Sequence, residues 1–179
     1  MTLTEARPFV SNPSYAQDRA DTIAKLILQS IDKPIVDIVA RFCELPCCFP
    51  LQSCFGHFVC DPEQDKYTLA PIPGGCKGPV RYRIAYIALC IEQSDLGRML
   101  REALAEISKI DPTYIQFGSA DWFWEKCLNS YVLQVEPSKY RNRDEAILDV
   151  SEARQVQAVR DIFFNELRQM VRVKDMFGQ

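Results

Sequence analysis

Hydrophobic residues recur at helical spacing in four segments of the chain. The segments lie at about 18–31, 35–44, 95–110 and from 151 onwards. Ser94 is a favourable N-cap for the third segment, and Pro112 ends it. We therefore expect four helices, the last of them long.

Between these segments lie four runs rich in β-branched and aromatic residues. They span 55–60, 80–91, 113–117 and 131–135. The run at 80–91 is the clearest, and its end is too apolar for the surface, so we expect it to be central. The order ααββαββα predicts an α+β fold: a two-layer sandwich whose helices pack on an antiparallel or mixed sheet of about four strands.

Two stretches lack regular periodicity. The segment 45–60 contains no charged residue, and Pro46 and Pro50 oppose helix formation, so we expect a buried or ligand-facing loop that enters the strand at 55–60. The segment 61–79 is rich in proline and glycine, which predicts a long surface loop.

Length and composition indicate an ordinary globular chain. It has 179 residues, of which 47% are hydrophobic and 25% charged. No repeat or linker divides it, so we expect a single domain over 1–179, with residues 1–13 flexible. The net charge of −3 creates no global attraction for nucleic acid, which could bind only at a local patch.

The cysteine content raises the question of disulfides or metal. Six of the eight cysteines lie between Cys43 and Cys76. Neither a signal peptide nor a long apolar span is evident, so we expect a cytosolic protein with reduced thiols and no membrane segment. The cysteine spacings are irregular and include no Cys-x-x-Cys pair, so we predict no metal site and assign the thiols to the core.

The sole histidine, His57, is the first candidate for acid–base chemistry. The alternative is a hydrogen-bonded structural histidine. Cys54 is a potential nucleophile, but three residues of extended chain span about 10 Å. A Cys54–His57 pair therefore requires a turn that folds back, and a cross-strand partner such as Glu136 is the other option.

Strand parity predicts a polar sheet face beside His57. Gln134 and Glu136 share one face of the last strand, and Arg81 and Arg83 share one face of the central strand. Gln116 is expected to join them. Together with Gly56, these groups suit an anionic or amide-bearing ligand, although a solvated sheet face would show the same alternation.

Two aromatic patterns indicate interaction surfaces. Trp122 lies with Trp124 in an aromatic cluster that could anchor a partner, stack on a ligand or pack at the edge of the core. Cations alternate with tyrosine at 81–83 and 139–143, a pattern that can bind single-stranded RNA. The chain contains none of the common phosphate-loop, dinucleotide-binding, serine-hydrolase or zinc-protease motifs.

The segment Ser53-Cys54-Phe55-Gly56-His57, which enters a strand after a helix and a proline-containing loop, resembles the Ser-Ser-Cys-Ser-Gly-Arg segment of the tRNA wybutosine-synthesis methyltransferase family. Glu136-Pro137 is similar to a Glu-Pro of that family. The resemblance covers about 25 residues, and Phe55 and His57 replace a Ser and an Arg. It implies S-adenosylmethionine binding and methylation of a tRNA base, with Cys54 and Gly56 at motif positions.

These observations favour a small-ligand-binding domain with a pocket between the segment 47–57 and the polar sheet face. They leave open whether it is an enzyme, and they identify no cofactor. The alternatives are an S-adenosylmethionine-dependent tRNA-modifying enzyme and a non-catalytic interaction module that docks through Trp122 and Trp124. In the last case both indoles should lie exposed together.

Overall fold

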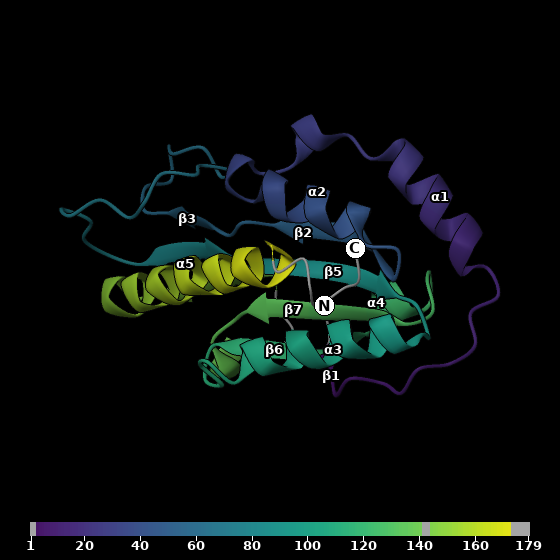
Figure 1. Cartoon of the computed structure of the whole chain (residues 1–179). Helices are drawn as coiled ribbons and strands as arrows, with labels where there is room; N and C mark the ends of the chain where they lie inside the picture. The colour runs from purple at the N-terminus through teal and green to yellow at the C-terminus, as the bar shows by residue number, and fades with distance from the viewer. Residues whose placement is uncertain (1–2, 141–143, 173–179) are drawn as a thin grey trace.

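The computed structural model describes residues 3–140 and 144–172, which form an α+β fold with two antiparallel sheets (Figure 1). The larger sheet has the strand order β1-β6-β7-β5-β2. Its strands are β1 (Leu3–Thr4), β2 (Cys48–Cys54), β5 (Ala85–Ile91), β6 (Ile115–Ala120) and β7 (Ser130–Val135). Every pair of neighbours is antiparallel.

The smaller sheet has the order β3-β4-β8. It comprises β3 (His57–Val59), β4 (Val80–Arg83) and β8 (Glu145–Leu148). Ile84 alone separates β4 from β5, so the two sheets join there. The buried Tyr82 hydroxyl secures this junction, because it donates to the Val135 carbonyl at 2.8 Å and accepts from the Ala85 N–H at 2.9 Å.

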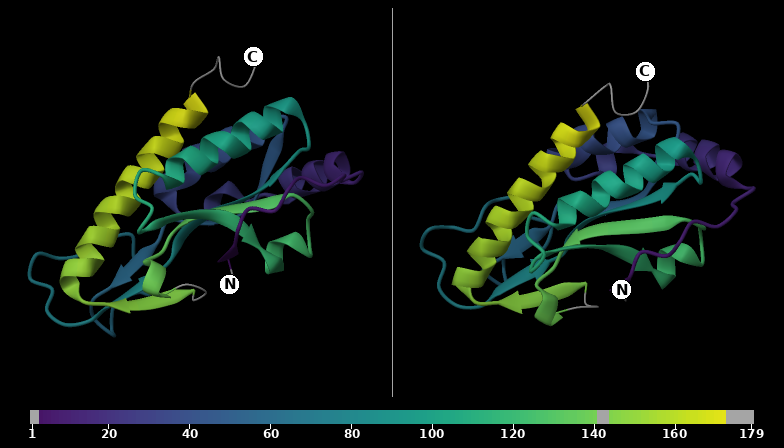
Figure 2. Two further views of the ribbon diagram at one scale, coloured as in Figure 1. Left: turned by 90° about the horizontal axis from the view of Figure 1, so that it is seen from below. Right: turned by 60° about the horizontal axis from the view of Figure 1, so that its bottom comes forward.

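Three helices cover one face of the larger sheet (Figure 2). They are α2 (Val36–Glu44), α3 (Asp95–Ser108) and α5 (Val150–Arg172). Their apolar sides pack against strand residues such as Ile87 and Leu133. The Ser94 side chain caps α3 by accepting from the Gly97 N–H.

The opposite face of the larger sheet is covered only in part. Helix α4 (Asp121–Trp124) places Phe123 against Ala88 and Val132, and α1 (Tyr15–Lys25) contributes Tyr15 to a small cluster with Phe49. Three short 3-10 helices complete the described chain: η1 (Leu28–Ser30), η2 (Lys33–Ile35) and η3 (Ser138–Tyr140).

The α+β class predicted from the sequence is confirmed. The described chain has eight strands in two sheets where about four were predicted. The predicted loop before residue 55 contains β2, which passes through Pro50 with an irregularity between Pro50 and Gln52. The predicted strand 80–91 is two strands, and the first helix ends at Lys25 rather than near Ile31.

Residues 3–10, part of the segment 1–13 predicted to be flexible, make several contacts with the rest of the fold. The Tyr131 hydroxyl donates to the Arg7 carbonyl at 2.9 Å, and the Val10 N–H donates to Asn129 Oδ1 at 2.9 Å. Phe9 also packs edge-on against Tyr131. This segment is therefore tied to the sheet. Across the described residues, no helix has both the length and the apolar character that a membrane crossing requires.

Candidate functional site

A bend at Gly56 brings Cys54 and His57 together. Gly56 lies between β2 and β3 with φ +89°, and its carbonyl accepts from the buried Arg160 Nη1 at 3.0 Å. The Cys54 sulfur and a His57 ring nitrogen then lie within 4.8 Å of each other. A Cys54–His57 pair depends on a turn that folds back, and the chain makes such a turn at Gly56.

His57 is held by groups on both ring nitrogens. It is only 2% exposed. Nδ1 lies 3.1 Å from the Thr68 carbonyl, which can only accept, so Nδ1 carries a hydrogen. Nε2 lies 3.3 Å from Asp32 Oδ2, and the same carboxylate oxygen accepts from the Phe55 N–H at 2.7 Å. The carboxylate paired with His57 thus belongs to Asp32, not to Glu136 as the sequence suggested.

This arrangement favours the charged pair. Burial opposes the imidazolium, but hydrogen bonds to Asp32, Cys54 and the Thr68 carbonyl outweigh it and raise the pKa of His57 to about 10. Burial also opposes the Asp32 carboxylate, yet the hydrogen bonds from His57 and Phe55 lower its pKa. Both shifts favour an imidazolium paired with a carboxylate at neutral pH.

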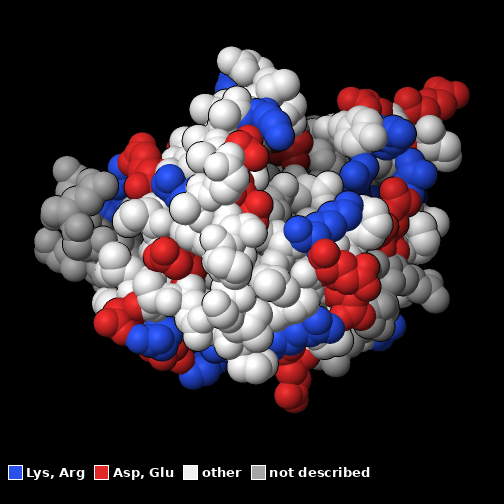
Figure 3. Space-filling model, turned by 90° about the vertical axis from the view of Figure 1, so that its right-hand side faces the viewer, with Lys and Arg blue, Asp and Glu red and all other residues white. Residues whose placement is uncertain are grey.

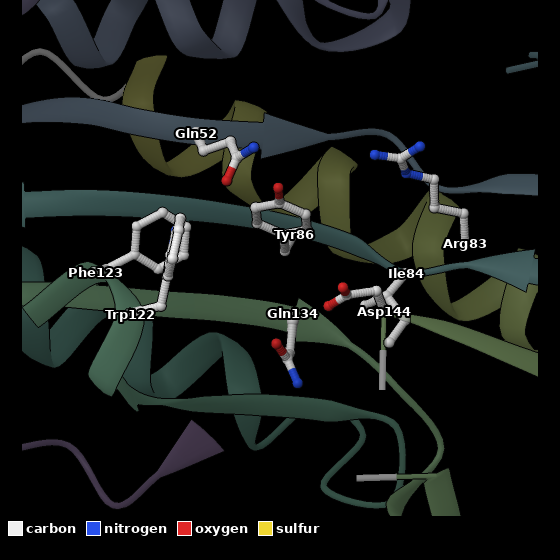
Figure 4. A pocket seen from close by; sticks show the side chains of 8 residues that line it. All are labelled: Gln52, Arg83, Ile84, Tyr86, Trp122, Phe123, Gln134 and Asp144. Atoms are coloured by element: carbon white, nitrogen blue, oxygen red, sulfur yellow. The ribbon is translucent and has the colours of Figure 1, made fainter. Parts of the chain in front are cut away.

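A pocket of about 430 Å³ opens on the uncovered face of the larger sheet. Gln52, Tyr86 and Gln134 come from the adjacent strands β2, β5 and β7. In Figure 4, the rings of Trp122 and Phe123 lie at one end and Arg83 lies at the other. Ile84 and Asp144 complete the lining.

The Cys54–His57 pair adjoins this pocket. Cys54 is opposite Tyr86 in the β2–β5 register, and His57 is opposite Arg83 in the β3–β4 register. The Cys54 sulfur also acts electrostatically on both Arg83 and Tyr86, which are lining residues. Burial is the main cause that raises the pKa of Tyr86, so its hydroxyl remains neutral and can donate to a ligand.

The polar residues predicted to share one sheet face do not all line the pocket. Gln116 is opposite Gln134, and Gln116 Nε2 donates to the Glu136 carbonyl at 3.0 Å. Gln134 Nε2 donates to Glu136 Oε2 at 2.6 Å, so Glu136 orients Gln134 from within the protein. Arg83 lines the pocket, whereas Arg81, two residues earlier on the same face of β4, does not.

The two tryptophans of α4 have different environments. Trp122 is 59% exposed and lines the pocket, with the Lys126 ammonium 3.4 Å from its ring centre. Trp124 packs edge-on against Tyr131 and lies under the Arg7 guanidinium. Trp122 is therefore exposed, whereas Trp124 is only partly exposed.

The second of the two predicted cation–tyrosine segments, 139–143, is described only in part. Lys139 pairs with Glu152 at 2.6 Å, and positions 141–143 of the predicted pattern lie outside the described residues. On the face in Figure 3, acidic and basic side chains of the described chain are interspersed.

Several site residues were not singled out from the sequence. They are Asp32, Gln52, Tyr86 and Asp144. Asp32 was interpreted only as the end of a helix, and Gln52 lay in a predicted loop. Tyr86 alternates with the buried Ala85 and Ile87 along β5, a signal that could have placed it on the polar face.

No protein-family model matches the chain, and no curated protein matches it. A solved structure of the PH1069 protein from Pyrococcus horikoshii is similar, with a TM-score of 0.53 and 9% identity, over 88% of this chain and 96% of that one. A hypothetical protein from Aeropyrum pernix matches with a TM-score of 0.44 and 13% identity, over 78% of this chain and 96% of that one. The likeness to PH1069 concerns the fold alone.

Proposed function

We propose that this protein binds a small molecule with a planar part and an anionic or amide group in the pocket above β2, β5 and β7. The observation that carries the proposal is the convergence of Gln52, Tyr86 and Gln134, from three adjacent strands, in one pocket. Its volume of about 430 Å³ suits a metabolite-sized ligand.

The two ends of the pocket suit different parts of such a ligand. Arg83 supplies a guanidinium for a carboxylate or phosphate, and Trp122 and Phe123 supply aromatic surface for a ring. Gln134 is buried and oriented by its 2.6 Å hydrogen bond to Glu136, so it needs little ordering when a ligand binds.

The chain offers a matched pair of arginines for the test. Nicotinamide, benzoate and adenosine monophosphate would be titrated into the protein, and amide NMR shifts would be recorded. We expect the probes to shift resonances around Gln134 and Trp122. With the anionic probes, these shifts should be lost in Arg83→Ala and retained in Arg81→Ala. A panel of planar anions and amides that moves no resonance near Gln134 would contradict the proposal.

A second candidate is S-adenosylmethionine-dependent tRNA modification. The segment that resembles the wybutosine-synthesis methyltransferases, Ser53 to His57, forms the β2–β3 bend beside the pocket. Arg83 and Asp144 are suited to the carboxylate and the amino group of S-adenosylmethionine, and the aromatic end to its adenine.

Thermal unfolding distinguishes the two candidates. A ligand present at 100 times its dissociation constant adds about 2.7 kcal/mol to the free energy of unfolding. If the second candidate is correct, millimolar S-adenosylmethionine raises Tm, and labelled methyl groups pass to unmodified tRNA. An unchanged Tm with S-adenosylmethionine, together with a rise for another planar anion, would leave only the first.

A further inference from the structure

Three side chains with different donor atoms converge beside the pocket. Asp32 precedes η2, Cys54 ends β2 and His57 begins β3. One donor atom from each, namely a carboxylate oxygen, the thiol sulfur and an imidazole nitrogen, lies within 4.8 Å of the other two. We propose that Asp32, Cys54 and His57 bind a single divalent transition-metal ion, with zinc as the best match.

The spacing of the nitrogen and oxygen donors agrees with tetrahedral coordination. Zinc bonds to nitrogen and oxygen are about 2.0–2.2 Å long, which puts two such donors of a tetrahedron about 3.3–3.6 Å apart. His57 Nε2 and Asp32 Oδ2 are 3.3 Å apart. An ion could therefore bind between them with little movement of either side chain.

The supporting contacts are those that orient metal ligands. A histidine ligand commonly donates its other ring N–H to a carbonyl or carboxylate. His57 Nδ1 donates to the Thr68 carbonyl, which directs Nε2 towards Asp32. The Phe55 N–H holds Asp32 Oδ2 from the backbone at 2.7 Å, so two of the three ligands are positioned in advance.

A hydrogen-bonded nucleophile triad explains the geometry less well. In such a triad the acid and the nucleophile use opposite imidazole nitrogens. Here Nδ1 is engaged by Thr68 and Nε2 faces Asp32, so Cys54 would have to share a nitrogen with one of them rather than use the one opposite the acid. Convergence of all three donors on one point instead suits an ion.

Charge and donor type select the metal. A carboxylate, a thiolate and a neutral imidazole together balance a dication, and this mixture of donors suits zinc or cobalt better than magnesium or calcium. Three protein ligands leave one coordination position open, as in catalytic rather than structural zinc sites. Since Cys54 adjoins Arg83 and Tyr86, we place this position towards the pocket.

The test uses the whole chain, stripped with a chelator and kept reduced, and titrated with Co²⁺ and then Zn²⁺. We expect one Co²⁺ per chain, with the charge-transfer absorption of a cobalt–thiolate bond, and displacement by Zn²⁺. Cys54→Ser abolishes this absorption, whereas Cys43→Ser and Cys60→Ser retain it. Asp32→Asn, which preserves side-chain size, weakens binding about 10- to 100-fold or more, since even outer partners of a site contribute that much.

A measurement on the unmodified protein avoids dependence on the folding of variants. The chain has one histidine, so its imidazole proton resonances are unambiguous, and Co²⁺ should shift them strongly at one equivalent. Imidazole resonances that stay in place, or cobalt absorption that persists in Cys54→Ser, would overturn the proposal. Neither result bears on ligand binding at Arg83 and Gln134, which is measured without metal.

Discussion

Gly56 is the residue on which the meeting of Cys54 and His57 depends. Its φ of +89° is unfavourable for other residues, and a Cβ there would lie 2.8 Å from the Ala85 Cβ. We expect Gly56→Ala to lower the free energy of unfolding by about 1–3 kcal/mol, from backbone strain and overpacking. Urea denaturation measures this change.

Gly75 provides the control for that substitution. A Cβ at Gly75 would meet nothing within 4 Å. Gly75→Ala should leave stability unchanged or raise it slightly, because alanine restricts the unfolded chain. Equal effects of the two substitutions would show that the bend does not need glycine.

The sole histidine allows a direct test of its partner. In the metal-free protein, burial disfavours the imidazolium, but its hydrogen bonds to Asp32, Cys54 and the Thr68 carbonyl prevail, and we expect the NMR titration of His57 to have its midpoint near pH 10. Asp32→Asn should move the midpoint down towards the usual value of about 6.5. Asp95→Asn, at an exposed position of α3, should not move it.

From the sequence, His57 could be identified as a candidate, together with the turn needed for its pairing with Cys54, but Asp32 could not. A histidine that is unique in the chain is visible in any reading of the sequence. The position of Asp32 next to His57 is not visible in the sequence. It depends on how the residue before η2 packs against the β2–β3 bend, where the Phe55 N–H donates to the Asp32 carboxylate. A long-range contact of this kind leaves no local periodicity.

At the level of elements, the junction of β4 and β5 relies on a buried hydroxyl. Tyr82→Phe would leave the Val135 carbonyl and the Ala85 N–H without their present partner in the core. We expect a loss of about 1–3 kcal/mol in the free energy of unfolding, the usual cost of an unsatisfied buried group. Thermal or urea unfolding would measure it.

Tyr140→Phe is the matched control, since the Tyr140 hydroxyl donates to the Ile147 carbonyl at an exposed position where water can replace it. A cost for Tyr82→Phe no larger than that for Tyr140→Phe would mean that the hydroxyl does not secure the junction.

The helices were easier to predict from the sequence than strand β2. Helices α2, α3 and α5 carry strong apolar stripes and were predicted close to their observed positions. Strand β2 was interpreted as part of a loop because the segment 45–60 is uncharged and Pro46 and Pro50 oppose helix formation, yet β2 is the edge of its sheet, where proline is tolerated. Edge position is a tertiary property that the local pattern does not contain.

Across the whole molecule, the long loop 61–79 connects the site to α5. The Ile72 N–H donates to Gln157 Oε1 at 2.8 Å, and Arg154 Nη2 donates to the Gly74 carbonyl at 2.9 Å. The same loop supplies the Thr68 carbonyl that orients His57. A segment predicted only as a surface loop thus links the longest helix to the imidazole.

The ion pair of Asp32 and His57 also sets a pH dependence for the stability of the metal-free protein. The pKa of His57 is raised to about 10 in the folded state, so its contribution is fully present below the unfolded value of about 6.5 and is lost as pH rises towards 10. The pKa of Asp32 is lowered, so its contribution is present above the usual value and is lost as pH falls through the folded value.

Since cysteines, tyrosines and lysines also titrate in alkali, the informative quantity is the difference in unfolding free energy between the unmodified protein and Asp32→Asn. We expect this difference, measured by urea denaturation with chelator and reductant, to be largest near pH 6 and to shrink towards pH 10. A difference that stays constant over this range would mean that the pair is not linked to folding.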